Sequence, residues 1–310
     1  MSQMRVGIAG GTGELGRLVA HELSSLGADV VILARGQHSS TPGVSESHET
    51  RLLNYHSKDD LVRSLEGLDV LVSTLSGLHP VIVEIQGRLI KAAALAKVKK
   101  FVPSDFGIDF RLVPYGDNRN LNLRRDFYDR FESVPIKKTS ILSGAFTDML
   151  TGTAPFIFFG LRRVLCWGDP HQKMDWTTRA DTARYTAHAA LDPDSPRFLR
   201  IAGDQISAAD IADVMSTITG RRHRVLKPSG LNGLRKLAQV TRFFLPGVEE
   251  VYPPWQGMQY MHNMFSGVAK FDQVDNDLYP IEFRTVSEVL RHHIESIEMN
   301  RVGINRLGRA

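Results

Sequence analysis

Three glycines near the start of the chain have the spacing that a dinucleotide-binding loop needs. Gly10, Gly13 and Gly16 lie in the stretch GGTGELG, between the apolar segment MRVGIAG and an amphipathic segment that begins at Glu14. Small residues at such a strand-to-helix turn let backbone amides and the helix N-terminus approach a pyrophosphate. The alternative is a tight turn without a ligand. The pattern predicts that the cofactor is bound by Gly10, Thr12, Gly13, Glu14, Leu15 and Gly16.

The end of the second apolar segment indicates which dinucleotide binds. DVVILA is followed by Arg35, and no carboxylate occurs before Glu46. An acidic residue at this point would bond a ribose 2′-hydroxyl, whereas an arginine can bond a 2′-phosphate. The sequence therefore predicts NADP(H), with His38, Ser39 or Ser40 as further donors. The alternative is a solvent-exposed arginine without a ligand.

Polar and aromatic residues follow three further apolar segments. They lie in VSTLSG, in FVPSDFG and in ILSGAF. If these segments are parallel strands, their carboxyl ends meet at one edge of the sheet, where ligands bind. We expect the cofactor to contact Ser73, Thr74, Leu75, Pro103, Ser104, Asp105, Phe106 and Phe146, with Ser143 and Gly144 beside them. For Phe146, a place in the core is the alternative.

The elements that position these residues alternate along the first 150 residues. Apolar segments of strand length begin near residues 4, 29, 51, 68, 99 and 138, and helical periodicity occurs over 14–26, 58–67, 80–97 and 120–133. Such alternation predicts the α/β class, with a doubly wound parallel sheet covered by helices on both faces. Beyond residue 150 we expect a strand near 197–203 to return to the main sheet. Ser207 with Asp210 and Thr285 with Glu288 predict capping boxes that begin two helices.

Composition and charge exclude several classes of protein. The chain has 310 residues and 42% hydrophobic content, which is ordinary for a globular protein. Its net charge of +4 arises from scattered residues, apart from Arg221–Arg224 and the tail, so we expect no nucleic-acid partner. The apolar runs are too short to span a membrane, and the N-terminus has no signal-peptide pattern, so we expect a cytosolic protein. The single cysteine, Cys166, is expected to be a buried small hydrophobe.

Together, the loop GGTGELG, Arg35, and PSDFG followed by an arginine-rich helix resemble the NmrA-like, atypical short-chain dehydrogenase/reductase group. The resemblance is to its isoflavone reductase and phenylcoumaran benzylic ether reductase members and the microbial aromatic alcohol reductases. It implies a Rossmann domain over 1–150 that binds NADPH, and a smaller, mostly helical substrate domain over 151–310. It also implies hydride transfer to a small aromatic or conjugated substrate, and that Ser104, Asp105 and Phe106 line the nicotinamide pocket. The alternative is a regulatory protein that senses NADP(H), as some NmrA-like proteins do. A homodimer is compatible with either.

One position departs from the pattern of that group. Its enzymes carry a catalytic lysine in the helix after the PSEFG motif, where this chain has Arg124. An arginine does not release a proton near neutral pH, so Arg124 is expected to act as a fixed cation. Its role would be to polarise a carbonyl, to hold a carboxylate or phenolate, or to bind the cofactor's phosphates. Tyr128 lies four residues further on and could supply the proton, although it could instead flank a buried stripe of Leu123, Phe127 and Phe131. Tyr115 and Asp105 are other possible donors.

Other catalytic arrangements are not supported by the sequence. No tyrosine is followed four positions later by lysine, G-x-S-x-G does not occur, and His292 and His293 are adjacent rather than on one helix face. We therefore expect no metal. The later segment YPPWQGMQYMHNMF is rich in aromatic residues and methionines, which form either the core or the wall of an apolar pocket. The residues concerned are Trp255, Met258, Tyr260, Met261 and Phe265.

Overall fold

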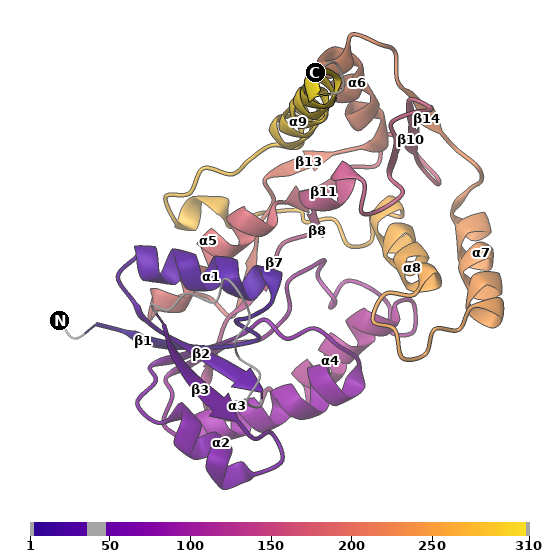
Figure 1. Ribbon diagram of the computed structural model, residues 1–310. Helices are drawn as coiled ribbons and strands as arrows, with labels where there is room; N and C mark the ends of the chain where they lie inside the picture. The colour runs from indigo at the N-terminus through magenta and orange to yellow at the C-terminus, as the bar shows by residue number, and fades with distance from the viewer. Residues whose placement is uncertain (1–2, 36–47, 308–310) are drawn as a thin grey trace.

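The computed structural model describes residues 3–35 and 48–307, and the side chains within them up to residue 299. A six-stranded parallel sheet lies at its centre, in the order β3-β2-β1-β4-β5-β6 (Figure 1). This is the doubly wound order, so the predicted α/β class and Rossmann topology are confirmed. The strands are β1 (Arg5–Ala9), β2 (Asp29–Arg35), β3 (Glu49–Leu53), β4 (Val70–Ser73), β5 (Lys100–Val102) and β6 (Lys137–Lys138).

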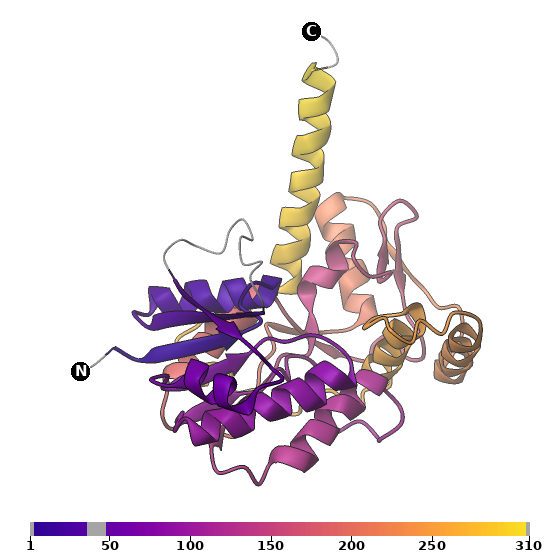
Figure 2. The same cartoon turned by 60° about the horizontal axis from the view of Figure 1, so that its bottom comes forward.

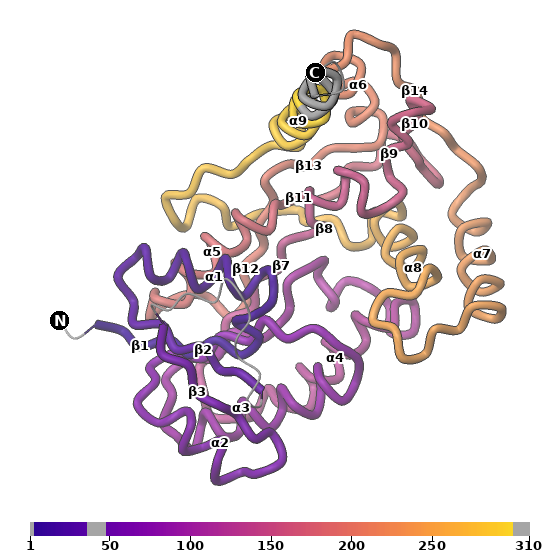
Figure 3. Tube along the Cα trace, viewed as in Figure 1, coloured from indigo at the N-terminus to yellow at the C-terminus, as the bar shows by residue number. Residues whose placement is uncertain are grey.

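The sheet continues beyond β6 through residues from the second half of the chain. Strand β7 (Ser140–Leu142) follows β6 after Thr139, whose N–H donates to the Phe101 carbonyl at 3.1 Å. Strand β12 (Phe198–Arg200) pairs with β7 in parallel, and the chain trace runs the two side by side (Figure 3). The segment near 197–203 therefore lies beside the continuation of the main sheet.

Helices cover both faces of the sheet, because successive apolar side chains along each strand point to opposite faces. Helices α1 (Glu14–Ser25) and α5 (Arg179–Leu191) pack on one face, in a cluster that includes Val6, Ile8 and Ile32. The other face carries Val31, Leu33 and Phe101 and is covered by three helices. These are α2 (Lys58–Leu65), α3 (Gln86–Leu95), which follows the π-helical turn η1 (Pro80–Ile85), and α4 (Arg119–Phe131).

A second body of structure follows the sheet. It contains two three-stranded sheets, one in the order β13-β11-β8 and the other in the order β14-β10-β9. Helix α9 begins against this body, with Val286 and Leu290 in its core, and the later turns of the helix extend clear of it (Figure 2). The elements are β8 (Ala145–Phe146), η2 (Thr147–Thr151), β9 (Ile157–Phe158), β10 (Arg163–Leu165), β11 (Met174–Thr177), β13 (Asp204–Ile206), α6 (Ala208–Thr219), β14 (Arg224–Leu226), α7 (Leu231–Phe244), α8 (Pro254–Phe265), η3 (Asn276–Leu278) and α9 (Val286–Leu307).

The predicted helix starts agree with the structure. Ser207 and Asp210 form the full capping box at α6, and Thr285 and Glu288 exchange the equivalent bonds before α9. Helix α5 packs on the sheet although it comes from beyond residue 150, so the two parts of the chain are joined over a wide area. The division near residue 150 stays a prediction.

Two other expectations concern single groups and the membrane. Cys166 is fully buried with a free thiol, as predicted. Among the helices in the described part of the chain, none is long and apolar enough to cross a membrane.

Candidate active site

The glycine-rich loop forms the turn between β1 and α1. Gly10 has a φ of 86°, a conformation that favours glycine, and its carbonyl accepts the Gly13 N–H at 2.9 Å. A Cβ atom at Gly16 would lie 2.3 Å from the Gly10 carbonyl oxygen, so Gly16 lets the helix approach the strand. Gly13 precedes α1 without a side-chain cap, and a Cβ atom there would meet only the Gly10 oxygen, at 3.3 Å. The free amides at this helix start are suited to an anion.

The next residues of this loop are more exposed. Thr12 and Leu15 are half-buried, and the exposed Glu14 lies 3.5 Å from Arg179, a residue of α5. The same Arg179 stacks on the half-buried ring of Phe146, with 5.0 Å between the guanidinium carbon and the ring centre. Arg179 therefore connects the start of α1 with the segment after β7, a link that sequence spacing does not reveal.

The ends of β4 and β5 are held together by hydrogen bonds. The Thr74 N–H and hydroxyl both donate to the Ala9 carbonyl, which ties the end of β4 to the glycine loop. The Ser104 hydroxyl donates to the Leu75 carbonyl at 2.7 Å, and the Ser104 N–H donates to Gln86 Oε1 at 2.9 Å. Gln86 is fully buried at the start of α3. Sequence reasoning missed it, although a glutamine in the apolar run VIVEIQGRLI was a visible signal.

The buried carboxylate of Asp105 begins a chain of hydrogen bonds. The Ser140 hydroxyl donates to Asp105 Oδ2 at 2.6 Å, and Arg197 Nη1 donates to Ser140 Oγ at 2.7 Å. Arg197 also forms a two-pronged ion pair with Glu132 at the end of α4, with distances of 3.0 and 2.8 Å. Burial raises the pKa of Asp105 overall, although the Ser140 hydrogen bond, Arg124 and Arg197 act to lower it.

Several buried polar atoms along this edge have no hydrogen-bond partner in the described part of the chain. They include Ser73 Oγ at the end of β4, Asp105 Oδ1 after β5 and Ser143 Oγ after β7, and Thr147 Oγ1 follows just beyond β8. Leaving such atoms unpaired costs free energy, so their gathering at the carboxyl edge indicates a place for a polar ligand. The glycine loop meets the same edge, and this arrangement fits an extended dinucleotide.

Arg124 lies on α4, in a region the sequence predicted to be catalytic. Its Nη1 donates to the Asn120 carbonyl at 3.1 Å, and its Nε is buried without a partner in the described structure. Burial acts to lower the pKa of Arg124, but the neighbouring Tyr260, Tyr252 and Asp105 raise it overall, so the side chain is a fixed cation.

Tyr260, on α8, is a neighbour of Arg124 that the sequence placed only among possible pocket walls. Burial raises the pKa of Tyr260 to about 12, against the opposing effects of Arg124 and of a hydrogen bond with Asn120. Of the other residues in that group, Trp255, Met261 and Phe265 are buried in the core. Met258 and Tyr260 are only partly buried.

A network of buried amides fixes α8 against α4. Asn118 Nδ2 donates to Asn263 Oδ1 at 3.1 Å, and Asn118 Oδ1 accepts Gln256 Nε2 at 2.7 Å. The same Oδ1 caps α4 by accepting the N–H groups of Asn120 and Leu121. Sliding one helix along the other would leave these groups unpaired, so the backbone around Arg124 and Tyr260 is held in a defined arrangement.

Tyr128 lies against aromatic residues. Its ring centre is 6.0 Å from that of Phe110 and 5.8 Å from that of Phe198, and Arg197 stacks over it at 5.4 Å. Leu123, Phe127 and Phe131 form the buried stripe of α4. The ring is thus one layer of a stack of rings and guanidinium groups, and a proton-donating role for Tyr128 stays a prediction. Tyr115 is exposed and donates to Asp126.

Arg35 ends β2 at the same edge of the sheet, and its side chain is exposed. Its charge acts to lower the pKa of Tyr55, whose buried ring lies nearby, although burial raises that pKa overall. The further donors predicted from the sequence, His38, Ser39 and Ser40, lie outside the described residues.

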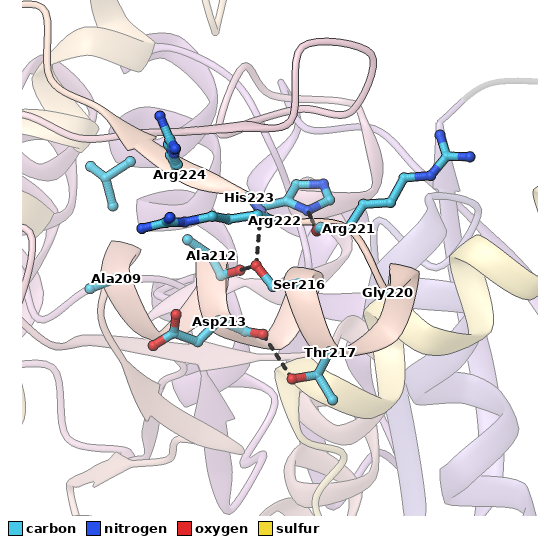
Figure 4. Close-up of a pocket in the computed structure, with 11 residues that line it drawn as sticks. Ala209, Ala212, Asp213, Ser216, Thr217, Gly220, Arg221, Arg222, His223 and Arg224 are labelled. Carbon is cyan, nitrogen blue, oxygen red and sulfur yellow. Dashed lines mark hydrogen bonds between the residues drawn. The ribbon is translucent and has the colours of Figure 1, made fainter.

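A surface hollow lies away from this edge, between α6 and β14 (Figure 4). Its lining includes Arg221–Arg224, the local excess of positive charge seen in the sequence. The two hydroxyl groups here have partners within the hollow: Ser216 accepts the His223 N–H at 2.9 Å, and Thr217 donates to the Asp213 carbonyl at 3.0 Å. No group of three His, Cys, Asp or Glu side chains suited to a metal ion occurs in the described part of the chain.

Comparison with known proteins identifies the family. Residues 2–290 match the model of the NmrA-like family. The chain belongs to the NmrA-like family. It is 24% identical over 320 residues to bifunctional pinoresinol-lariciresinol reductase 2 of Thuja plicata, covering 94% of this chain and 98% of the relative.

Solved structures show the same fold. The structure of AtPrR2 with NADP+ and (+)-pinoresinol superposes with a TM-score of 0.77 at 20% identity, covering 94% of this chain and 99% of the other. The binary complex of leucoanthocyanidin reductase and NADPH from Vitis vinifera gives a TM-score of 0.76 at 21% identity, with the same coverage. These matches agree with the resemblance inferred from the glycine loop, Arg35 and PSDFG.

Proposed function

We propose that this NmrA-like protein is an NADPH-dependent reductase that transfers hydride to a small aromatic or conjugated substrate. The relative that matches nearly the whole chain is a reductase, and two structural neighbours are complexes with NADP+ or NADPH. This supports the reductase over the regulatory sensor.

The observation that carries the proposal is the set of unpartnered polar atoms at the carboxyl edge. Ser73, Asp105 and Ser143 follow different strands, yet their free atoms lie along the edge where the glycine loop ends β1. We propose that the pyrophosphate binds at Gly10, Thr12, Gly13, Glu14, Leu15 and Gly16 and the 2′-phosphate at Arg35. The nicotinamide half is assigned to Ser73, Thr74, Leu75, Pro103, Ser104, Asp105, Phe106 and Phe146.

Arg124 is proposed to stabilise negative charge that develops on the substrate. Its buried Nε has no acceptor in the described structure, and its charge persists at any physiological pH. A guanidinium fixed on a helix is a preorganised donor for an oxyanion. The proton must then come from another group, for which Tyr128, Tyr260 and Asp105 are the candidates.

Two measurements test the function. Isothermal titration calorimetry with NADPH and NADH measures which dinucleotide binds, and we expect a clear preference for NADPH. A screen of aromatic ketones, enones and benzylic ethers, followed by the loss of NADPH absorbance, then tests hydride transfer. Tight NADPH binding without oxidation by any compound of a broad screen would favour the sensor. The cytosolic location and a homodimer are further proposals, and light scattering would measure the second.

A further inference from the structure

We propose, resting on the function above, that Asp105 stores a proton while NADPH is bound and releases it when the cofactor becomes NADP+. Asp105 would in this way couple the proton consumed in the reduction to the transfer of hydride. The inference stands on the hydrogen-bond geometry around the carboxyl group.

One oxygen of Asp105 is held by a hydroxyl whose direction is fixed. Arg197 has only N–H donors, so its contact with Ser140 Oγ at 2.7 Å makes that oxygen an acceptor. The Ser140 proton therefore points to Asp105 Oδ2, at 2.6 Å. Arg197 is itself held by Glu132. Oδ2 is thus an acceptor in either protonation state, and the acid proton belongs on the other oxygen.

That other oxygen, Oδ1, is buried and has no partner in the described structure. Asp105 as a whole is only 2% exposed. A buried, unpaired oxygen is costly for a carboxylate, whereas in the neutral acid it carries a proton and can donate to a ligand. The charged groups that face Asp105 are Arg124 from α4, Arg197 before β12, and Asp109 from the same loop.

The position of Asp105 connects this proton to the cofactor. Asp105 follows β5, two strands from the glycine loop and on the opposite side of β1 from Arg35. A dinucleotide with its 2′-phosphate at Arg35 would extend its nicotinamide half toward β4 and β5. The nicotinamide ring is neutral in NADPH and positive in NADP+, and a nearby positive charge favours the ionised carboxylate.

The resulting step is balanced in atoms and charge. The nicotinamide ring loses a hydride, with its two electrons, to a substrate carbon and becomes positive. Asp105 loses its proton, which the substrate takes up on oxygen or on the adjacent carbon, and becomes negative. The site keeps the same total charge, because the new cation and the new anion arise together. Arg124 cannot fill this role, because its guanidinium does not release a proton.

The test measures protons released on binding, so it requires no substrate. NADP+ and NADPH are titrated into the protein by calorimetry in two buffers of different ionisation enthalpy, over a range of pH. We expect NADP+ to release up to one proton more than NADPH. The difference should be confined to the pH window between the pKa of Asp105 with NADP+ bound and its pKa with NADPH bound. Within this window, the affinity for NADP+ relative to that for NADPH should rise by up to tenfold per pH unit, and outside it the ratio of affinities should not change with pH.

Asp105→Asn is the decisive variant, because asparagine has the shape of the neutral acid but cannot ionise. It should bind both nucleotides with equal proton release at every pH. Ser140→Ala removes the donor to Oδ2 and should move the window to higher pH, since the carboxylate loses a stabilising hydrogen bond. The control is Asp175→Asn, another buried acid, whose two oxygens accept from Gln205 and Phe271; it should keep the proton release of the wild type.

The outcomes separate this inference from the proposed function. If the wild type binds both nucleotides tightly with equal proton release, the role of Asp105 is overturned while the cofactor assignment stands. The same holds if Asp105→Asn retains the wild-type difference in proton release between NADP+ and NADPH, provided that a thermal unfolding transition shows the variant to be folded. If neither nucleotide binds, both the function and the inference are overturned.

Discussion

Gly16 and Gly13 lie one helical turn apart, and the structure predicts that alanine at each will have a different effect. At Gly16, a Cβ atom would lie 2.3 Å from the Gly10 carbonyl oxygen and 2.8 Å from Gly11 Cα. Both are backbone atoms that cannot rotate away, so α1 must shift relative to β1. Overpacking of this kind costs about 1–3 kcal/mol, occasionally more.

At Gly13 the same substitution should be tolerated by the fold. Its φ of −75° and ψ of 169° are open to any residue, and the nearest contact of a Cβ atom is 3.3 Å. We expect the free energy of unfolding to change by less than about 1 kcal/mol, because the loss at the helix start is offset by a less flexible unfolded chain. The added methyl would nevertheless occupy the approach of the pyrophosphate. Affinity for NADPH should fall by about tenfold or more, or about 1.4 kcal/mol, and Gly13→Val should abolish it.

The assay is thermal and chemical unfolding without nucleotide, combined with calorimetric titration of NADPH. Gly16→Ala should lower the melting temperature by a few degrees, at about 2–4 °C per kcal/mol for a chain of this order of size, and weaken NADPH binding. Gly13→Ala should lose NADPH affinity at nearly wild-type stability. An equally stable Gly16→Ala would refute the packing argument. Undiminished NADPH binding by Gly13→Ala would show that the pyrophosphate lies elsewhere.

Six further substitutions, at five residues, test the other interpretations. Arg35→Ala should weaken NADPH by about 1.5–3 kcal/mol, the range for a hydrogen bond to a charged group, and leave NADH nearly unchanged by calorimetry. Arg124→Ala should reduce turnover by about 10²–10³-fold, while its NADPH affinity stays within a few-fold of the wild-type value. Arg124→Lys should recover part of the lost turnover. Full activity of the alanine variant would show that Arg124 has a structural role only. Tyr260→Phe should reduce turnover more than Tyr128→Phe, because Tyr260 neighbours Arg124 whereas Tyr128 is stacked on Phe110 and Phe198; the reverse order in steady-state kinetics would favour Tyr128. Lys100→Met should lower the free energy of unfolding by about 3 kcal/mol. The reason is that Lys100 Nζ donates to the carbonyls of Ala189, Ala190 and Asp192 at the end of α5. Denaturant unfolding measures this loss of stability.

The sheet and its glycine loop were predictable because their signals are local. The spacing of Gly10, Gly13 and Gly16 between a strand and a helix is contained in seven consecutive residues of the sequence. Strands β1, β2 and β4 are mostly continuous apolar runs. A short continuous apolar run is typical of a parallel strand that is buried on both faces. The same holds for the capping box of Ser207 and Asp210, whose partners are three residues apart.

The short strands of the second half could not be predicted in this way. Strands β8 and β9 have two residues each, and they exist because partners elsewhere in the chain pair with them. Ser57 and Asp60 also have the spacing of a capping box at the start of α2, but only half of that box forms. Ser57 Oγ accepts the Asp60 N–H, but the Ser57 N–H donates to the Asn54 carbonyl, so the reciprocal bond does not form. Pairing with distant segments and turn formation, rather than the local preference of the sequence, determine the structure of these segments.

The surroundings of Arg124 show most clearly what the sequence lacked. Spacing along α4 suggested Tyr128 as its partner, because residues four apart share a helix face. The structure also brings Tyr260 to Arg124 from α8, through amide contacts of Asn118 with Gln256 and Asn263 that no local pattern records. A fixed cation at the position where the family resemblance implies a proton-transferring lysine would separate two tasks that one lysine can combine. Charge stabilisation stays on α4, and the proton must come from a different element, either α8 or the loop after β5. An enzyme organised in this way should have a pH dependence governed by Tyr260 or Asp105, and not by Arg124.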